Sequence, residues 1–593
     1  MQYLNLAVAP GIFNEASDYT AQARWVDGNH IRFYKGQPQP IGGYRQVENT
    51  NEAQGIVRGA IDWIALDGRK VIGLGTNLKL YVWIGNTYYD ITPIEEEDEL
   101  TDPFTTTNGS DIVEVTHVNH GRLEGDFVIF DNASAVGGIT IDGEYQVVEV
   151  IDADTYTIIH SAQATSDATG GGTVDYIYLL GTGQVNGILG LGWGAGEWGM
   201  GTWGTPRTDS GILIPPRTWS LTNWGEDLIA NPRGGGIYWW DYSNGTTVRA
   251  EALAAASDAP EHVQFVLVSP TTRHMIAFGC EPFGSSDPDP MHVRWCTQND
   301  FNSTDAWEPL EENTAGDVQL DHGSQIISAI ETSNNEILIF TDTAVYSMVY
   351  VGPPQVFTTR LMGTAAGISA PYARATFGAY TWWMGPEDFY IYDGRVRTLP
   401  CEVRSYIFSR INNDQRDKIF AATNRIWQEV WWFYPSENST EIDSYVAYNW
   451  NDNTWHYGDM ERVSWIDRNE ISPTPIAWDV GGLMYEHELQ DQEIEDVFVE
   501  SGFMRMGEAD DFVFLDRVVP DFERINRPIR FYINGKKYPA SEVETKGPIQ
   551  LRDTTEKQDF RLRAKNFSIK LESDSSIWRL SSLKLRVVND GKR

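Results

Sequence analysis

Three tryptophans recur at five-residue intervals in a glycine-rich segment, and they are the clearest candidates for a contact site in this 593-residue chain. Trp193, Trp198 and Trp203 each offer a large apolar ring with a single hydrogen-bond donor, and the glycines around them allow a partner to approach closely. Rings of this kind can stack on sugars or bases. An assembly contact or a packed surface loop uses the same features, and we expect one of these two in place of a stacking platform. The three tryptophans are thus a candidate assembly contact.

Paired carboxylates are the second chemistry to consider, because the chain has 84 Asp and Glu residues. Glycoside hydrolysis requires two carboxyl groups that flank the scissile bond. The S-x-D-x-G-x-T-W box of sialidase blades is absent, and the nearest matches, residues 302–307 and 451–455, lack its glycine and are typical of turns. No Walker loop, G-x-S-x-G or H-E-x-x-H motif occurs. We therefore expect no enzymatic activity and no catalytic residues.

The histidines, cysteines and clustered carboxylates of this chain lack the spacing of a metal site. His117 and His120 are three residues apart, which suits a helix, but their segment has strand composition. The acidic run at residues 95–99 lacks the spaced ligands and turn glycine of a calcium loop, and we expect a solvated linker there. The cysteines are odd in number and far apart: Cys280, Cys296 and Cys401. We expect no metal and no cofactor, and folding in a reducing cytoplasm.

Seven strand-turn-strand units supply the framework for these residues. After the first unit, successive units start 47, 62, 43, 50 and 46 residues apart. A period of this size with paired short strands predicts a mainly β fold built on a β-propeller of about seven blades. The predicted strand pairs are 71–74 with 78–84, 228–230 with 237–242, 275–278 with 292–296, 337–340 with 344–350, 380–384 with 389–392, 430–434 with 445–450, and 476–479 with 483–485.

Two further modules accompany the predicted propeller. The first two units start 157 residues apart, so we interpret residues 86–178 as an inserted acidic β-barrel or sandwich domain, with the propeller formed by residues 1–85 and 179–490. Residues 491–593 alternate apolar and polar positions and predict a C-terminal basic β-module. Apolar residues at four-residue spacing predict one helix over residues 402–418.

Charge differs strongly between these modules. The whole chain carries a formal charge of −39, whereas residues 524–593 contain 17 Lys and Arg against 8 Asp and Glu. A strongly acidic surface repels a phosphate backbone, so we expect little grip on nucleic acid. Modules of opposite charge favour an assembly in which different faces meet different neighbours.

No long apolar run or basic leader occurs, and we expect a soluble chain without membrane insertion.

Short strings spread over nearly the whole chain resemble a family of bacteriophage tail proteins. They include GIF at residues 11–13, RWVDG at 24–28, IRF at 31–33 and IGGY at 41–44. Further strings are LPC at 399–401, QEVWWFYPS at 428–436, the glycine-tryptophan segment at 190–204, and the ending DGKR at 590–593. The chain thus resembles the short-tail nozzle or hub proteins of podoviruses, which are related to packaged-DNA stabilisation proteins.

This resemblance implies a structural subunit of the virion tail that assembles in the host cytoplasm. It implies a homo-hexameric ring below the head-to-tail adaptor, contacts with tail fibres or spikes, and genomic double-stranded DNA that passes through the ring without specific binding. From the charge we expect the bore to be poor in Lys and Arg. The alternative is a glycan-binding or glycan-cleaving propeller of a receptor-binding tail component, in which the three tryptophans stack on sugars.

Overall fold

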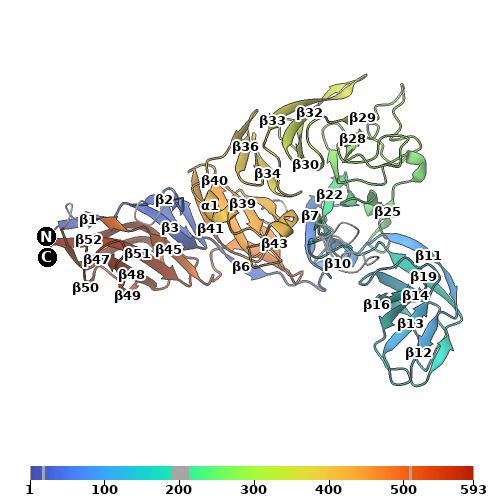
Figure 1. Ribbon diagram of the computed structural model, residues 1–593, viewed down its shortest axis with the longest axis horizontal. Helices are drawn as coiled ribbons and strands as arrows, with labels where there is room; N and C mark the ends of the chain where they lie inside the picture. The colour runs from blue at the N-terminus through green and yellow to red at the C-terminus, as the bar shows by residue number, and fades with distance from the viewer. Residues whose placement is uncertain (1, 16–20, 190–212, 470, 506–510, 592–593) are drawn as a thin grey trace, which may run out of the picture. The chain divides into compact units, whose positions relative to one another are not determined.

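The computed structural model describes residues 2–15, 21–189, 213–469, 471–505 and 511–591 (Figure 1). These residues form two compact units. Unit 1 comprises Met1–Glu48, Ile330–Val349 and Thr359–Arg593, and unit 2 comprises Asn49–Ala329 and Tyr350–Thr358. Among the described helices, none has the length and apolarity to span a membrane.

Seven four-stranded sheets are arranged like propeller blades, and each contains one predicted strand pair as its two central strands. In unit 2 they are β7–β10 (Val57–Ile64, Lys70–Thr76, Leu80–Ile84, Thr87–Asp90), β22–β25 (Trp219–Trp224, Asp227–Pro232, Tyr238–Trp240, Glu251–Ala252) and β26–β29 (Phe265–Ser269, His274–Phe278, His292–Trp295, Gly316–Gln319). The predicted β-propeller class is therefore confirmed.

The other sheets continue the same pattern. The fourth is β30–β33 (Ile326–Glu331, Glu336–Thr341, Ala344–Gly352, Val356–Thr364). In unit 1 the fifth and sixth are β34–β37 (Arg374–Phe377, Tyr380–Met384, Phe389–Tyr392, Val396–Thr398) and β38–β41 (Phe420–Asn424, Glu429–Tyr434, Ser444–Asn449, Thr454–Asp459). The seventh has the order β42-β43-β44-β6 (Ser464–Ile466, Ile476–Trp478, Met484–Leu489, Gly43–Gln46). Its outer strand thus comes from the N-terminal segment.

Two glycines explain how β6 reaches this last sheet. A Cβ atom at Gly42 would lie 2.3 Å from the Cα atom of Glu488, and one at Gly43 would lie 2.5 Å from the carbonyl oxygen of Gln492. Real Cβ atoms essentially never come so close to backbone, so only glycine permits this approach. The IGGY string is therefore a packing requirement of unit 1.

The inserted domain in unit 2 consists of two sheets around one core. One sheet has the order β11-β19-β14-β15 (Ile94–Thr101, Thr173–Leu179, Phe127–Asp131, Gly143–Gln146). The other has the order β16-β17-β13-β12-β18 (Glu149–Asp152, Thr155–Ile159, Ile112–Thr116, Phe104–Thr106, Ala168–Gly170). Phe104, Val128 and Tyr156 are buried between them. Residues 95–99 are solvent-exposed as expected, but they belong to β11 and not to a linker, because their backbone pairs with β19.

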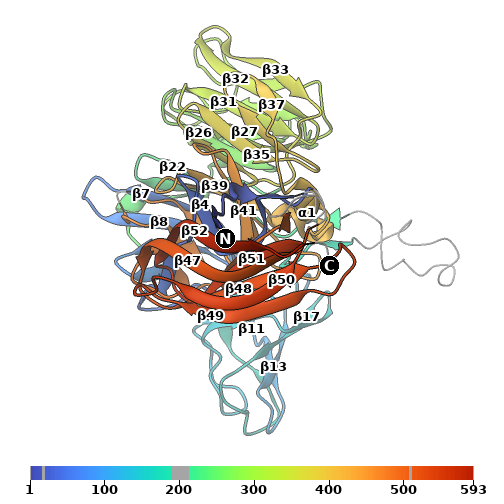
Figure 2. The same cartoon turned by 90° about the vertical axis from the view of Figure 1, so that its left-hand side faces the viewer.

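Strands from both ends of the chain build the C-terminal module of unit 1. One sheet has the order β1-β52-β47-β50 (Gln2–Asn5, Trp578–Asn589, Val513–Ile525, Gln558–Ala564). The other has the order β2-β3-β45-β51-β48-β49 (Ala9–Ile12, Arg24–Asn29, Val497–Ser501, Asn566–Ser573, Ile529–Lys536, Glu544–Leu551), with β46 (Met504–Arg505) paired to β51. β1 and β52 lie side by side where the termini are marked in Figure 1, and Figure 2 shows β47, β48 and β51 from the side.

This pairing differs from the boundaries drawn from the sequence, which assigned residues 1–85 to the propeller. β1, β2 and β3 join sheets of the C-terminal module, and β4 (Ile31–Tyr34) and β5 (Gln37–Pro40) form a hairpin. β6 joins the seventh blade, and β7, β8 and β9 lie in the first blade. β1 and β52 are separated by more than 450 residues, so no local sequence pattern predicts that they pair. Two short two-residue strands, β20 (Ile188–Leu189) and β21 (Leu213–Ile214), complete the described strands.

The prediction of one long helix over residues 402–418 is wrong. The structure has a five-residue helix, α1 (Arg404–Phe408), followed by a 3-10 helix at Asn413–Lys418. Ile411 forms an isolated β-bridge with Ser436, and the Asn412 side chain accepts a hydrogen bond from the Asp414 backbone N–H and caps the second turn. The apolar spacing therefore reflects packing onto neighbouring strands and not one continuous helix.

Candidate functional site

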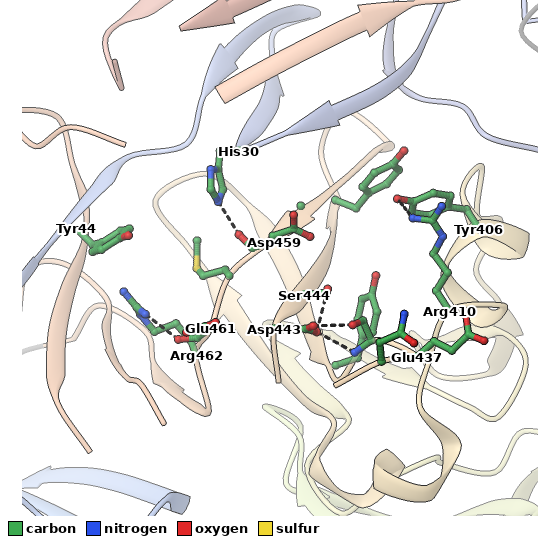
Figure 3. A pocket seen from close by; sticks show the side chains of 16 residues that line it. His30, Tyr44, Tyr406, Arg410, Glu437, Asp443, Ser444, Asp459, Glu461 and Arg462 are labelled. Atoms are coloured by element: carbon green, nitrogen blue, oxygen red, sulfur yellow. Dashed lines mark hydrogen bonds between the residues drawn. The ribbon is translucent and has the colours of Figure 1, made fainter. Parts of the chain in front are cut away.

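A polar pocket of about 730 Å³ lies beside α1, β40 and β41 in unit 1 (Figure 3). Its lining combines tyrosines, arginines and carboxylates from the N-terminal segment and the sixth blade: His30, Tyr44, Tyr406, Arg410, Tyr434, Glu437, Asp443, Asp459, Glu461 and Arg462. This composition is the kind that binds sugars or small polar ligands, so the availability of each group decides what the pocket can do.

The aromatic rings of this pocket are already covered. The Arg410 guanidinium lies 3.9 Å from the centroid of the Tyr406 ring, and Tyr457 stacks on that ring at 4.4 Å. Tyr44 is approached in the same way by Arg462, at 4.7 Å, and by the stacked His487 ring, at 5.3 Å. A ligand would have to displace these groups before it could stack on either ring.

The carboxylates fall into a fixed group and an open group. Asp443 accepts hydrogen bonds from the Ser436 backbone N–H and hydroxyl, at 2.8 and 2.6 Å, and from the Ser444 hydroxyl at 3.1 Å. Asp459 has no side-chain hydrogen bond among the described residues, and burial together with the nearby Asp443 and Asp27 raises its pKa. Asp459 is therefore open to a ligand, as is the exposed Glu437 of the same pocket.

Arg462 is a buried cation at the edge of the pocket. Its Nε donates to Nε2 of His487 at 2.9 Å, and its Nη1 donates to the backbone carbonyl of Glu461 at 2.7 Å. The guanidinium lies over the Tyr485 ring at 4.2 Å as well as over Tyr44. Burial lowers the pKa of Arg462, and burial followed by the Arg462 charge lowers that of His487. This cluster holds β6, β44 and the Glu461 loop together.

A second cluster in unit 1, the Arg32 network, has buried charged side chains. Arg32 donates to both oxygens of Glu488, at 2.6 and 2.5 Å, and its Nη2 lies 3.1 Å from Oε2 of Glu429. Trp427 also donates to Glu488, at 2.7 Å, and Nε2 of His456 lies 3.3 Å from Glu429. Burial alone raises the pKa of Glu429, but Arg32 and His456 outweigh it and hold that pKa below its usual range. The network joins the β4 strand to the sixth and seventh blades.

The residues singled out from the sequence are not gathered into one site. Trp193, Trp198 and Trp203 lie outside the described residues. Nδ1 of His117 lies 2.8 Å from the Tyr178 hydroxyl, and Nε2 of His120 lies 3.1 Å from the Asp152 carbonyl oxygen, so both histidines make structural contacts within the inserted domain.

The buried thiols of unit 2 are unreactive. Cys280 and Cys296 are fully buried, and burial raises the pKa of each to about 12.

One acidic group in unit 2 has the geometry to hold a cation. Carboxylate oxygens of Asp258, Asp305 and Glu308 lie within 4.8 Å of one another. Asp258 is exposed, and it also lines a second pocket of about 720 Å³ beside β24 and β25. Exposed carboxylates often gather in this way without a metal, and no other feature of the group points to one.

Comparisons with known proteins yield distant likenesses only. No family model and no curated protein matches the chain. Among solved structures, it is similar to the extracellular domain of a hybrid two-component system from B. thetaiotaomicron, with 10% identity over 89% of this chain and 72% of that chain and a TM-score of 0.31.

Two further structures are glycan-cleaving enzymes by their titles. The exo-β-1,3-galactanase of Phanerochaete chrysosporium has 10% identity over 68% of this chain and 100% of its own, with a TM-score of 0.23. The endosialidase of phage phi92 has 10% identity over 72% of this chain and 64% of its own, with a TM-score of 0.19. Identities and scores this low do not transfer an activity to this chain.

Sequence reasoning missed both clusters of unit 1. Arg32 stands in the IRF string, but its partner Glu488 is 456 residues away and lies in an acidic stretch that reads as solvated surface. The available signal was an arginine at the centre of an otherwise apolar strand, because such a cation requires a buried counter-charge.

Proposed function

We propose that this protein is a structural subunit of a short phage tail, and that copies of it form a ring below the head-to-tail adaptor through which the genome passes. The proposal rests on the resemblance to podovirus nozzle and hub proteins and on what the residues that carry it do in the fold. It assigns the chain a role in assembly and in conducting DNA.

The observation that carries this proposal is that residues in the strings shared with the tail-protein family make structural contacts in this fold. Trp25 is 2% exposed in β3, which pairs with β45 of the C-terminal module. Arg32 and Glu429, from two different strings, meet in the Arg32 network. Gly42 provides the close approach to Glu488. Residues that connect segments far apart in the sequence are expected in a rigid structural subunit more than in a catalytic site.

Charge in the C-terminal module is consistent with a conduit that does not grip DNA. Many of its arginines are paired within the module: Arg517 with Asp559, Arg530 with Asp574, Arg563 with Asp590, Arg579 with Glu523, and Arg586 with Asp516. Cations paired in this way displace fewer counterions from a phosphate backbone. The net charge of −39 per copy adds a repulsive background.

A stoichiometry measurement tests this proposal. Native mass spectrometry of the purified full-length chain at micromolar concentration is expected to find six copies in a closed assembly. A duplex DNA of about 40 base pairs is expected to remain unbound at physiological salt, where non-specific binding by phosphate contacts is weak. A chain that stays monomeric, or that retains DNA tightly under these conditions, contradicts the proposal.

Glycan binding is the second candidate function, and the open groups of the unit 1 pocket favour it. Arg410, Glu437 and Asp459 face the cavity in Figure 3 and offer the donors and acceptors that sugar hydroxyls need. The covered tyrosine rings weigh against it, since sugars bind best on a free aromatic face.

Paired substitutions in the pocket test this second candidate. If the pocket binds glycans, Asp459→Asn and Arg410→Ala should each abolish binding on a glycan array, while Arg397→Ala, outside the pocket, should leave it intact. We expect instead that the unaltered chain binds no glycan on the array. Binding that depends on Asp459 would establish the second candidate.

A further inference from the structure

The solvent-facing side of the sheet β11-β19-β14-β15 is an acidic face. Glu99 is in register with Asp175, which is in register with Asp131, so three carboxylates form one row across three adjacent strands. Directly opposed side chains in a sheet lie roughly 4.5–5.5 Å apart, and like charges at that distance are destabilising. The Asn132 side chain donates to Asp175, but no cation pairs with this row among the described residues.

A second row on this face places apolar side chains beside the acidic row. Glu97 is in register with Ile177, and Ile177 with Ile129. Both isoleucines are half-buried, and Glu97 is exposed. Apolar side chains bordered by charge are typical of a protein-binding surface.

The outer side of the sheet β1-β52-β47-β50 has the opposite character. Arg586 is in register with Arg517, and each is already paired with a carboxylate of the sheet, Asp516 and Asp559, while the exposed Tyr3 continues that row. Lys584 and Arg561 are exposed on the same side and have no ion-pair partner among the described residues. The half-buried Phe514 and Val588 add apolar surface to this basic face.

The two faces complement each other in charge and in spacing. Strands in any sheet lie about 4.8 Å apart, so a row of carboxylates across one sheet has the same pitch as a row of cations across another. The carboxylate row carries like charges that repel, and docking it against the unpaired Lys584 and Arg561 of the basic face relieves that repulsion.

We infer that the acidic face of one copy binds the basic face of a second copy of this chain. The inference rests on the proposed assembly of copies into a ring and names the surfaces that make the contact. In a ring of more than two copies such a contact is heterologous, so that each copy offers one face to one neighbour and the other face to the next.

Charge reversal in the full-length chain tests this contact. We expect Glu99→Lys with Asp131→Lys to weaken self-association at least about tenfold in sedimentation velocity, because like-charge juxtaposition costs several kcal/mol. Lys584→Glu with Arg561→Glu should weaken it equally. Mixing the two reversed proteins should restore assembly, because their faces complement each other again. The control, Glu311→Lys with Glu312→Lys, makes the same charge change at exposed positions of unit 2 and should assemble normally.

The outcomes separate this inference from the proposed function. If the ring forms but neither reversal weakens it, the named faces are wrong while the ring proposal stands. If an unaltered chain is monomeric at every salt concentration, both fail. A reversal that changes the shape of a monomer without changing its mass also overturns the inference, because the faces then meet within one copy. Circular dichroism of each variant verifies that it is folded.

Discussion

Replacing Arg32 by methionine is expected to lower the free energy of unfolding of unit 1 by about 3–5 kcal/mol, the cost of removing one partner from a buried ion pair. Arg32 and Glu429 are both fully buried, so the substitution leaves the negative charges of Glu429 and Glu488 without a counter-charge. Urea unfolding followed by tryptophan fluorescence measures the effect, with Trp427 in direct contact with the network.

The pH dependence of this loss has a defined sign. With Arg32 present, the pKa of Glu429 is held below its usual range, so the network contributes stability that is lost only when the pH falls through that lowered value. Without Arg32, burial raises the pKa of Glu429, and protonation at mildly acidic pH removes the unpaired charge. The deficit of the variant should therefore shrink between pH 8 and pH 5.

The matched control is Arg45→Met, which removes an exposed arginine from its ion pair with Glu486 in the same β6 region. Solvent screens that pair, and we expect its unfolding midpoint to stay unchanged. Equal midpoint shifts for the two variants would show that burial of the Arg32 network does not stabilise unit 1.

Trp219→Ala is expected to destabilise unit 2 by about 3–5 kcal/mol, the usual cost of deleting a buried large aromatic side chain. Trp219 is 1% exposed, and its Nε1 donates to the Thr76 carbonyl oxygen at 2.7 Å, which ties β22 to the first blade. A Cβ atom on Gly75 would lie 2.2 Å from its Cγ, so the indole packs directly on the β8 backbone.

Trp239→Ala provides the comparison for Trp219, because Trp239 is half-buried and its ring forms a T-shaped contact with Phe301. We expect it to lower the thermal midpoint by less than half as much as Trp219→Ala does. If the two shifts were the same, the contact between the first two blades would not be the stabilising element that the burial of Trp219 indicates.

Local pattern accounts for the part of this fold that the sequence predicts. The seven strand pairs are rich in apolar and aromatic residues and are separated by turn residues, so each can be found without knowledge of its neighbours. The spacing between the first two units likewise reveals the inserted domain.

Long-range pairing accounts for what the sequence does not predict. β1 pairs with β52, and β6 completes the seventh blade with β44, in each case across more than 400 residues. Arg32 and Glu488 are equally far apart, so neither residue shows on its own that it belongs to a buried pair. The predicted helix over residues 402–418 is wrong for a related reason, since Ile411 forms a β-bridge with Ser436 although its spacing from Val403 fits one helical stripe.

Imaging of the assembled protein by cryo-electron microscopy tests the central claim most directly, because it reports both the symmetry and the residues that face the axis. We expect a six-fold ring whose bore is poor in Lys and Arg, as a chain of net charge −39 and a sliding duplex require. A monomer, a trimer with a glycan in the unit 1 pocket, or a ring with a continuous basic lining would contradict the account.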